Sequence, residues 1–215
     1  MHSMIKILIT DDQQIYVDAL RTVLKTEEDL KVIGEANNGV VLLELLKSES
    51  PDVILLDINM PEMNGIEASA AIRKEYPEIK IVMLTMHKEI DMIMRLLNIG
   101  VHAYLLKNSS KKEIVRVINV VHDGGTYFGE EVKETIVDSF VEQGMNRDIK
   151  LTKYEKEILC LICAGNSNRQ LVQELKLDIN EVFNAKASLF NKLEVNNNTS
   201  LIRYAYENNL IDFFV

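Results

Sequence analysis

The stretch that decides the fold is Asp52-Val53-Ile54-Leu55-Leu56-Asp57-Ile58-Asn59-Met60-Pro61-Glu62-Met63-Asn64-Gly65. Its four apolar residues, 53–56, are typical of a short strand that is buried on both faces. Asp57 ends the apolar run, and Pro61 and Gly65 indicate a loop before the next helix. An acid at the carboxyl end of a buried parallel strand lies where open α/β sheets place their sites. Taken alone, Asp57 fits a solvated strand end equally well.

Four other polar residues favour a site at this strand end, because each follows an apolar run: Asp11 and Asp12 after residues 5–9, Thr85 after 79–84, and Lys107 after 103–106. In a parallel sheet these run ends share one edge, so three carboxylates, a hydroxyl and an ammonium group are expected to converge. Mg²⁺ relieves the repulsion between clustered carboxylates, and an ammonium group supplies a positive charge for a phosphoryl oxygen. Because aspartate can act as a covalent nucleophile, the pattern predicts an aspartyl phosphate.

Residues 4–122 resemble the receiver domain of bacterial two-component response regulators. The matching marks are Asp11-Asp12, Asp57 followed by Met60-Pro61 and Gly65, Thr85, and Lys107, in this order and at strand ends. The resemblance implies that Asp57 is the phosphoacceptor and takes its phosphoryl group from a sensor histidine kinase. It also implies that Asp12, Asp57 and the backbone carbonyl of Asn59 bind Mg²⁺ directly, while Asp11 acts through water.

The same resemblance assigns roles around the phosphoryl group. Lys107 and Thr85 hold its oxygens, and Tyr104 is an aromatic switch that turns inward when Thr85 moves toward it. The alternative for Tyr104 is a half-buried tyrosine of the last strand. No other substrate pocket is indicated, so the chain is expected to catalyse only its own phosphotransfer and autodephosphorylation and not to be a conventional enzyme.

Composition limits the remaining classes. The chain has 215 residues, of which 47% are hydrophobic, so it can form one large or two modest domains. No apolar run approaches a membrane span, and Met1-His2-Ser3 is too short for a signal peptide, so a cytoplasmic protein without membrane contact is expected. Cys160 and Cys163 lie in an apolar helical segment without a second Cys/His pair, which favours core packing over zinc or redox chemistry.

Strand and helix patterns alternate through the first half, with helices expected at 15–24, 40–46, 66–75, 91–99 and 111–122. Five such units predict an α/β fold with a doubly wound, five-stranded parallel sheet, right-handed crossovers and the strand order 2-1-3-4-5. We expect a receiver domain at 1–123, a glycine-punctuated linker with one amphipathic helix at 124–150, and an all-α domain at 151–215.

The all-α domain is expected to contain four helices. Thr152 and Glu155 form the pattern of a capping box at the first, and the others are expected at 169–175, 179–193 and 200–208. The second and third are joined by a short turn, as in a helix-turn-helix. The segment resembles the LuxR/NarL/FixJ-type DNA-binding domain through Leu151-Thr152, Glu155, Glu157-Ile158-Leu159, Gly165, Ser167-Asn168, Leu175, Val182, Lys192-Leu193 and Ala205. The two resemblances together imply a phosphorylation-controlled transcription regulator that binds DNA as a dimer.

The third helix departs from that family pattern, which usually has Thr, Lys and His where this chain has Glu181, Phe183 and Ala185. A helical wheel assigns a core face to Val182, Leu189 and Leu193. The opposite face, expected to enter the major groove, consists of Asn184, Ala187, Ser188 and Asn191, with Phe183 at its flank. It carries no Lys or Arg, and Lys186 falls near the core face, where its stem is expected to snorkel.

The charge balance is also unusual for a DNA-binding protein. The chain has a formal charge of -9, and residues 148–215 contain eight Lys/Arg against nine Asp/Glu, where a basic footprint is usual. The residues expected to contact DNA are Thr152, Lys153, Asn168, Arg169, Phe183, Asn184, Ala187, Ser188 and Lys192. The alternative is a signalling adaptor whose helix-turn-helix domain has lost DNA binding and contacts protein instead, an idea that the exposed Phe183 favours.

Overall fold

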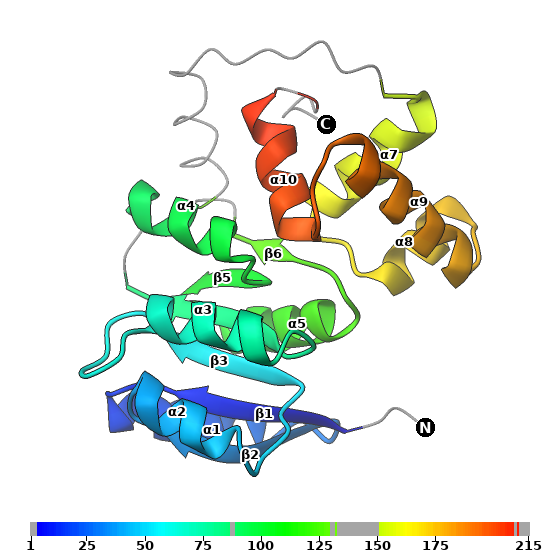
Figure 1. Ribbon diagram of the computed structural model, residues 1–215. Helices are drawn as coiled ribbons and strands as arrows, with labels where there is room; N and C mark the ends of the chain where they lie inside the picture. Colours follow the sequence, from blue (N-terminus) through cyan, green and yellow to red (C-terminus); the bar gives the residue numbers. More distant parts are fainter. Residues whose placement is uncertain (1–3, 87–88, 130–131, 133–150, 209, 211–215) are drawn as a thin grey trace. The chain divides into compact units, whose positions relative to one another are not determined.

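The computed structural model describes residues 4–86, 89–129, 132, 151–208 and 210. The elements are β1 (Ile5–Thr10), α1 (Gln14–Leu24), β2 (Leu30–Ala36), α2 (Gly39–Leu45), β3 (Val53–Asp57), α3 (Gly65–Glu75), β4 (Lys80–Thr85), α4 (Ile90–Ile99), β5 (Ala103–Leu106), α5 (Lys111–His122), β6 (Tyr127–Phe128), α7 (Lys153–Cys163), α8 (Asn168–Leu175), α9 (Ile179–Lys192) and α10 (Asn198–Glu207) (Figure 1). They fall into two compact units. The first contains β1 to β5 with α1, α2, α3 and α5, and the second contains α4, β6 and α7 to α10.

The sheet has the strand order β2-β1-β3-β4-β5-β6, and its first five strands are parallel. The predicted fold class and the predicted order of those five strands are confirmed. All five predicted strands are present, and the sheet has one further strand, β6, that was not predicted. This strand has only two residues, which is too short to give an alternating pattern in the sequence.

Strand β3 is central to the first unit because every one of its residues is buried. It lies between β1 and β4, and Figure 1 shows α3 and α5 on opposite sides of the sheet. A strand covered on both faces must be apolar along its whole length, which is what residues 53–56 provide. The only charged residue of β3 is Asp57, at the strand's carboxyl end.

The register of the sheet brings the predicted site residues to one edge. Thr10 pairs with Leu56, Asp57 with Leu84, and Thr85 with Leu106. The backbone N–H of Lys107 donates to the carbonyl oxygen of Thr85 at 2.8 Å, which extends the β4–β5 pairing by one residue. The four strands β1, β3, β4 and β5 therefore end at nearly the same level.

The loop after Asp57 returns directly beneath the strand end. Asn64 caps α3 through a capping box with Glu67, and the N–H of Gly65 donates to the carbonyl of Ile58 at 2.8 Å. A Cβ atom on residue 65 would lie 2.0 Å from the carbonyl oxygen of Asp57. Only glycine fits at this close approach, so Gly65 allows the loop to lie directly against the backbone of Asp57.

Three of the helices in the second unit begin with a capping box, formed by Thr152 and Glu155, Ser167 and Gln170, and Asp178 and Glu181. The predicted Thr152–Glu155 capping box is confirmed, as is the count of four helices in residues 151–208. The core of these helices is formed by Ile158, Leu159, Ile162, Leu171, Val182, Leu189, Leu201 and Ile202.

Core packing, the role predicted for both cysteines, holds for only one of them. Cys163 is buried on the core side of α7, whereas Cys160 is exposed, so the prediction is wrong for Cys160. Cys160 and Cys163 are three positions apart, so their side chains point in directions that differ by about 300° around the helix axis. This is enough to place Cys160 outside the narrow face of α7 that packs in the core.

The linker helix predicted around residues 132–141 lies outside the described residues, except for Val132, which is buried. The boundaries proposed for the receiver domain, linker and helical domain stay predictions. Among the helices of the described residues, none has the length and apolar character needed to cross a membrane.

Candidate phosphoacceptor and DNA-binding sites

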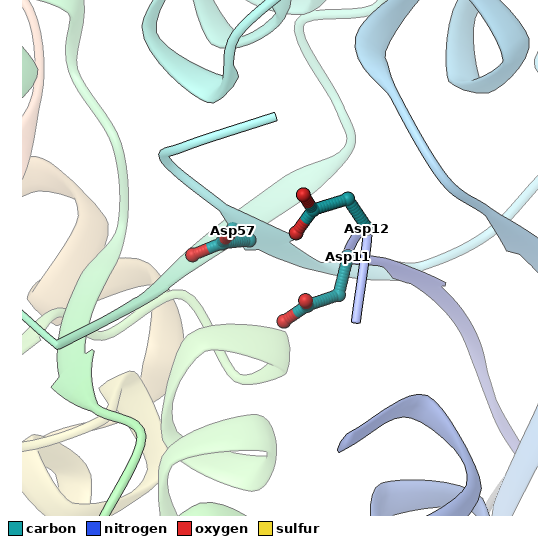
Figure 2. A group of neighbouring side chains, drawn as sticks. All are labelled: Asp11, Asp12 and Asp57. Carbon is teal, nitrogen blue, oxygen red and sulfur yellow. The ribbon is translucent and has the colours of Figure 1, made fainter. Parts of the chain in front are cut away.

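Three carboxylates meet at the carboxyl edge of the sheet (Figure 2). Asp11 and Asp12 follow β1, Asp57 ends β3, and one ligand oxygen from each lies within 4.8 Å of the others. Asp11 and Asp57 are buried, whereas Asp12 is exposed. The group therefore has a closed side within the protein and an open side toward solvent.

Lys107 closes the inner side of this acidic group. Its Nζ atom lies 2.7 Å from Asp11 Oδ2 and 3.3 Å from Asp57 Oδ1. The side chain of Lys107 is 4% exposed, and those of Asp11 and Asp57 are 1% and 4% exposed, so both ion pairs are shielded from water. Removing Lys107 would leave the buried carboxylates of Asp11 and Asp57 without their cation, which is strongly destabilising.

The carboxyl group of Asp57 has a pKa above its ordinary value of 3.8. Burial is the largest cause, and repulsion from Asp11 adds to it. The attraction of Lys107 and hydrogen bonds from Lys107 and the Ile58 backbone lower the pKa but do not cancel the rise. Asp57 is thus held in an environment that penalises its charged form, and a further cation nearby would relieve the penalty.

The donor set fits a hard divalent cation. Asp11 Oδ1 accepts from the N–H of Gln13 at 2.9 Å, whereas Asp11 Oδ2 is buried and its partner is the ammonium group of Lys107 at 2.7 Å. Asp12 is exposed, and Asn59 is exposed in the loop after β3, so both can be approached from solvent. Mg²⁺ prefers such carboxylate and carbonyl oxygens and keeps several waters on an open side.

The two predicted switch residues are fully buried in this structure. Thr85 is at the end of β4 and Tyr104 is in the middle of β5, and neither has any exposed surface. The alternative of a half-buried strand tyrosine is therefore wrong. Tyr104 already occupies the inward position, while the switching role assigned to it stays a prediction.

Sequence reasoning missed one residue of this site, Tyr16 on the first turn of α1. Its hydroxyl donates to the carbonyl oxygen of Lys107 at 3.3 Å, and the Lys107 Nζ atom lies 5.0 Å from the centre of its ring. Burial and the nearby charges of Asp11 and Asp57 raise the pKa of Tyr16 to about 12. The sequence shows that Tyr16 follows Asp11-Asp12 closely, but it gives no sign of a contact with Lys107, which is 91 positions away.

Helix α9, the third of the four helices in residues 151–208, shows the two faces expected of it. Val182, Leu189 and Leu193 are buried, and Lys186 is buried beside them. The exposed face carries Phe183, Asn184, Ala187, Ser188, Asn191 and Lys192. The helical-wheel assignment is confirmed, and Phe183, 53% exposed, is a large apolar side chain on that outer face.

Two of the other predicted DNA contacts already have protein partners. Asn168 Oδ1 accepts from Lys186 Nζ at 2.8 Å, and Lys192 Nζ pairs with Glu155 Oε2 at 2.8 Å. Thr152, Lys153 and Arg169 are exposed near the starts of α7 and α8. The outer face of α9 and these two helix starts provide mainly amide, hydroxyl and apolar groups, with few cations.

The raised pKa of Asp57 predicts a stability change that depends on pH. The folded state holds the Asp57 proton more tightly than the unfolded state, so ionisation costs stability as the pH rises above 3.8, and the cost remains at pH 7. Asp57→Asn should therefore raise the Tm by a few degrees at pH 7 without Mg²⁺, and the gain should shrink as the pH falls toward 4. Thermal unfolding monitored by circular dichroism measures this.

The matched control is Glu75→Gln, which removes one exposed carboxylate at the end of α3. It should leave the Tm nearly unchanged. An Asp57→Asn protein that is less stable than wild type at pH 7 would contradict the electrostatic account.

Comparison with known proteins assigns both halves of the chain. Residues 7–119 match the model of the response regulator receiver domain, and residues 150–205 match bacterial regulatory proteins of the luxR family. The transcriptional regulatory protein MctR of Rhizobium johnstonii is 35% identical over 96% of this chain and 95% of its own length. The response regulator protein VraR of Staphylococcus epidermidis is 33% identical over 96% of this chain and 99% of its own length.

Among solved structures, RcsB of Salmonella enterica serovar Typhimurium, bound to a promoter in the presence of a phosphomimetic, has a similar fold. Its TM-score is 0.59 at 23% identity, covering 94% of this chain and 98% of RcsB. The site geometry and the two full-length relatives lead to the same assignment. The chain belongs to the response regulators that combine a receiver domain with a helix-turn-helix domain of the luxR family.

Proposed function

We propose that the protein is a cytoplasmic transcription regulator controlled by phosphorylation of Asp57 by a sensor histidine kinase. The observation that carries the proposal is the buried ion-pair group in which Lys107 lies 2.7 Å from Asp11 and 3.3 Å from Asp57. Family membership and the naming of MctR as a transcriptional regulatory protein support it. Residues 1–123 act as the receiver, 124–150 as the linker and 151–215 as the DNA-binding domain.

In the proposed transfer, a carboxylate oxygen of Asp57 attacks the phosphorus of a phosphohistidine. A new P–O bond forms as the P–N bond breaks, and the electron pair leaves with the imidazole of the kinase. Asp12, Asp57 and the Asn59 carbonyl would hold Mg²⁺, which when bound supplies positive charge to the phosphoryl oxygens. Lys107 moves its ammonium group from Asp57 to a phosphoryl oxygen, and the Thr85 hydroxyl donates to another. Hydrolysis of the aspartyl phosphate by the same site returns the protein to its starting state.

Treatment of the full chain with acetyl phosphate and Mg²⁺ should add one phosphoryl group, detected as a single mass increment in the intact protein. Chelation of Mg²⁺ should abolish the labelling, and Asp57→Asn should remove it because the nucleophilic oxygen is lost. Asp52→Asn, at the start of the same segment, is the matched control and should label normally. Labelling of Asp57→Asn to the wild-type extent would reject Asp57 as the acceptor.

Phosphorylation should shift the protein toward a dimer. The phosphoryl group can change an equilibrium only if it interacts better with one state, and the Thr85 hydroxyl provides that difference by bonding to it. Tyr104, which is fully buried on the neighbouring strand β5, would stabilise the new position by staying inward. Sedimentation with and without acetyl phosphate, over a range of concentrations, measures the shift. Thr85→Ala should weaken it, and an unchanged mass distribution in wild type would contradict the proposed dimer.

The proposed DNA interface is the exposed face of α9 with the starts of α7 and α8. Asn184 can read an adenine edge, and Phe183 or Ala187 can contact thymine methyl groups, but the face cannot form the Arg or Lys fork to guanine. Lys153, Arg169 and Lys192 are the cations available for phosphates, with the helix N-termini. The proposed readout is therefore directed at A·T-rich sites with a small electrostatic contribution.

The affinity of the phosphorylated protein for its upstream DNA should depend only weakly on salt, because each phosphate contact contributes a slope of about -0.9 and few are made. Asn184→Ala should reduce discrimination between sequences by about 1–3 kcal/mol, whereas Lys192→Ala should weaken all sequences alike. Binding titrations on upstream and random DNA across a salt series measure both effects.

The adaptor alternative rests on the exposed Phe183, but family membership and the regulatory relatives do not favour it. Glu174→Gln, which changes an exposed charge of α8 away from the proposed contacts, serves as the control for the DNA titrations. Absence of binding to any DNA at low salt would leave the adaptor as the better account.

A further inference from the structure

Tyr16 contacts Lys107 in two independent ways. The hydroxyl donates to the backbone carbonyl of Lys107 at 3.3 Å, and the ring lies 5.0 Å from the ammonium nitrogen of the same residue. The first contact fixes the backbone where the chain leaves β5, and the second lies against the charged tip of the side chain. One aromatic residue of α1 thus contacts both ends of the lysine.

The groups around Lys107 Nζ all favour a positive charge at this position. Lys107 Nζ has carboxylates of Asp11 and Asp57 on one side at 2.7 and 3.3 Å, and the Tyr16 ring supplies a further electron-rich surface. A tyrosine hydroxyl is protonated at physiological pH and burial raises the pKa of Tyr16 further, to about 12, so the hydroxyl can donate to the carbonyl. The four-carbon side chain of a lysine rotates freely about its bonds. The two contacts with Tyr16 restrict this rotation in Lys107 without neutralising the charge of the ammonium group.

A restricted lysine matters when the phosphoryl group arrives. The ammonium group must then leave Asp57 and bond a phosphoryl oxygen, which requires it to remain in the site while its carboxylate partner reacts. Asp11 alone could hold the ammonium group away from the phosphoryl group. A ring contact is not directional in the way that a hydrogen bond is, so it allows this movement while excluding water.

We propose that Tyr16 is a positioning residue that holds Lys107 in place for phosphoryl transfer to Asp57. The inference rests on the proposed phosphorylation of Asp57. The ring of Tyr16 makes the main contribution to positioning the ammonium group of Lys107, and the hydroxyl holds the backbone of Lys107 in place. Tyr16 itself touches neither the phosphoryl group nor the metal.

The first test measures the contact without any phosphorylation. In the full-length protein labelled with ¹⁵N-lysine, without Mg²⁺, the ammonium signal of Lys107 should be shifted upfield by the Tyr16 ring, and its assignment is given by its loss in Lys107→Ala. Tyr16→Phe should keep the upfield shift and Tyr16→Leu should remove it. An unchanged Lys107 signal in Tyr16→Leu would overturn the proposal.

The second test measures the rate at which acetyl phosphate labels Asp57 at saturating Mg²⁺. Tyr16→Leu should lower this rate about tenfold, the effect of losing a contact of the strength typical for a desolvated cation on an aromatic ring. Tyr16→Phe should retain most of the rate because the ring remains. The control is Ile15→Ala, since Ile15 is on the same turn of α1, is 82% exposed and should have no effect.

The outcomes separate this inference from the proposed function. A wild-type protein that is not labelled at all would reject the phosphorylation proposal, while the Lys107 signal would still report the contact. Labelling in wild type with an equal rate in Tyr16→Leu would overturn the positioning role. An equal loss in Tyr16→Leu and Tyr16→Phe would overturn the assignment of the ring as the main contributor.

Discussion

The structure of the first unit depends on one constraint, the burial of a charged carboxylate at the end of a strand that is otherwise entirely apolar. The side chain of Asp57 is 4% exposed, and the approach of Lys107 together with a hydrogen bond from the Ile58 backbone offsets part of the cost of that burial. Parallel pairing makes this possible, because it brings β1, β3, β4 and β5 to one level and so brings the lysine to the acid. The sheet therefore determines the site through register, before any loop contributes.

This arrangement also gives a physical basis for the proposed response of the site to a phosphoryl group. Lys107 is shared between two carboxylates, at 2.7 Å from Asp11 and 3.3 Å from Asp57, and burial together with repulsion from Asp11 keeps the pKa of Asp57 raised. A group that brings both negative oxygens and an accompanying cation changes the partners of all three residues together. Gly65 lets the following loop lie against the Asp57 carbonyl, so a movement of Asp57 would displace the backbone of this loop directly.

Much of this could be predicted from the sequence because apolar runs define buried strands and their ends define the edge of a parallel sheet. The convergence of Asp11, Asp57 and Lys107 follows from that rule alone, and the two faces of α9 follow from helical periodicity. Strand β6 has two residues, too few to show a period. The contact between Tyr16 and Lys107 depends on the distance from α1 to the end of β5, which no local pattern encodes. The segment around Cys160 is apolar at almost every position, so its sequence pattern does not show that Cys160 lies on the exposed side of the helix.

The separation of the two faces of α9 has a consequence for evolution. Lys186 is the only cation between the two ends of that helix, and it is buried against Asn168, so it belongs to the fold and not to the surface. The exposed positions, in contrast, support no core contact, and substitutions at such positions usually change stability little. If the exposed face of α9 contacts DNA as proposed, Asn184 or Ala187 could be exchanged for another residue, with a change in the regulated genes, at little cost to the stability of the domain. Substitutions on the exposed face of α9 would change the free energy of unfolding little, whereas a substitution of Lys186 would lower it.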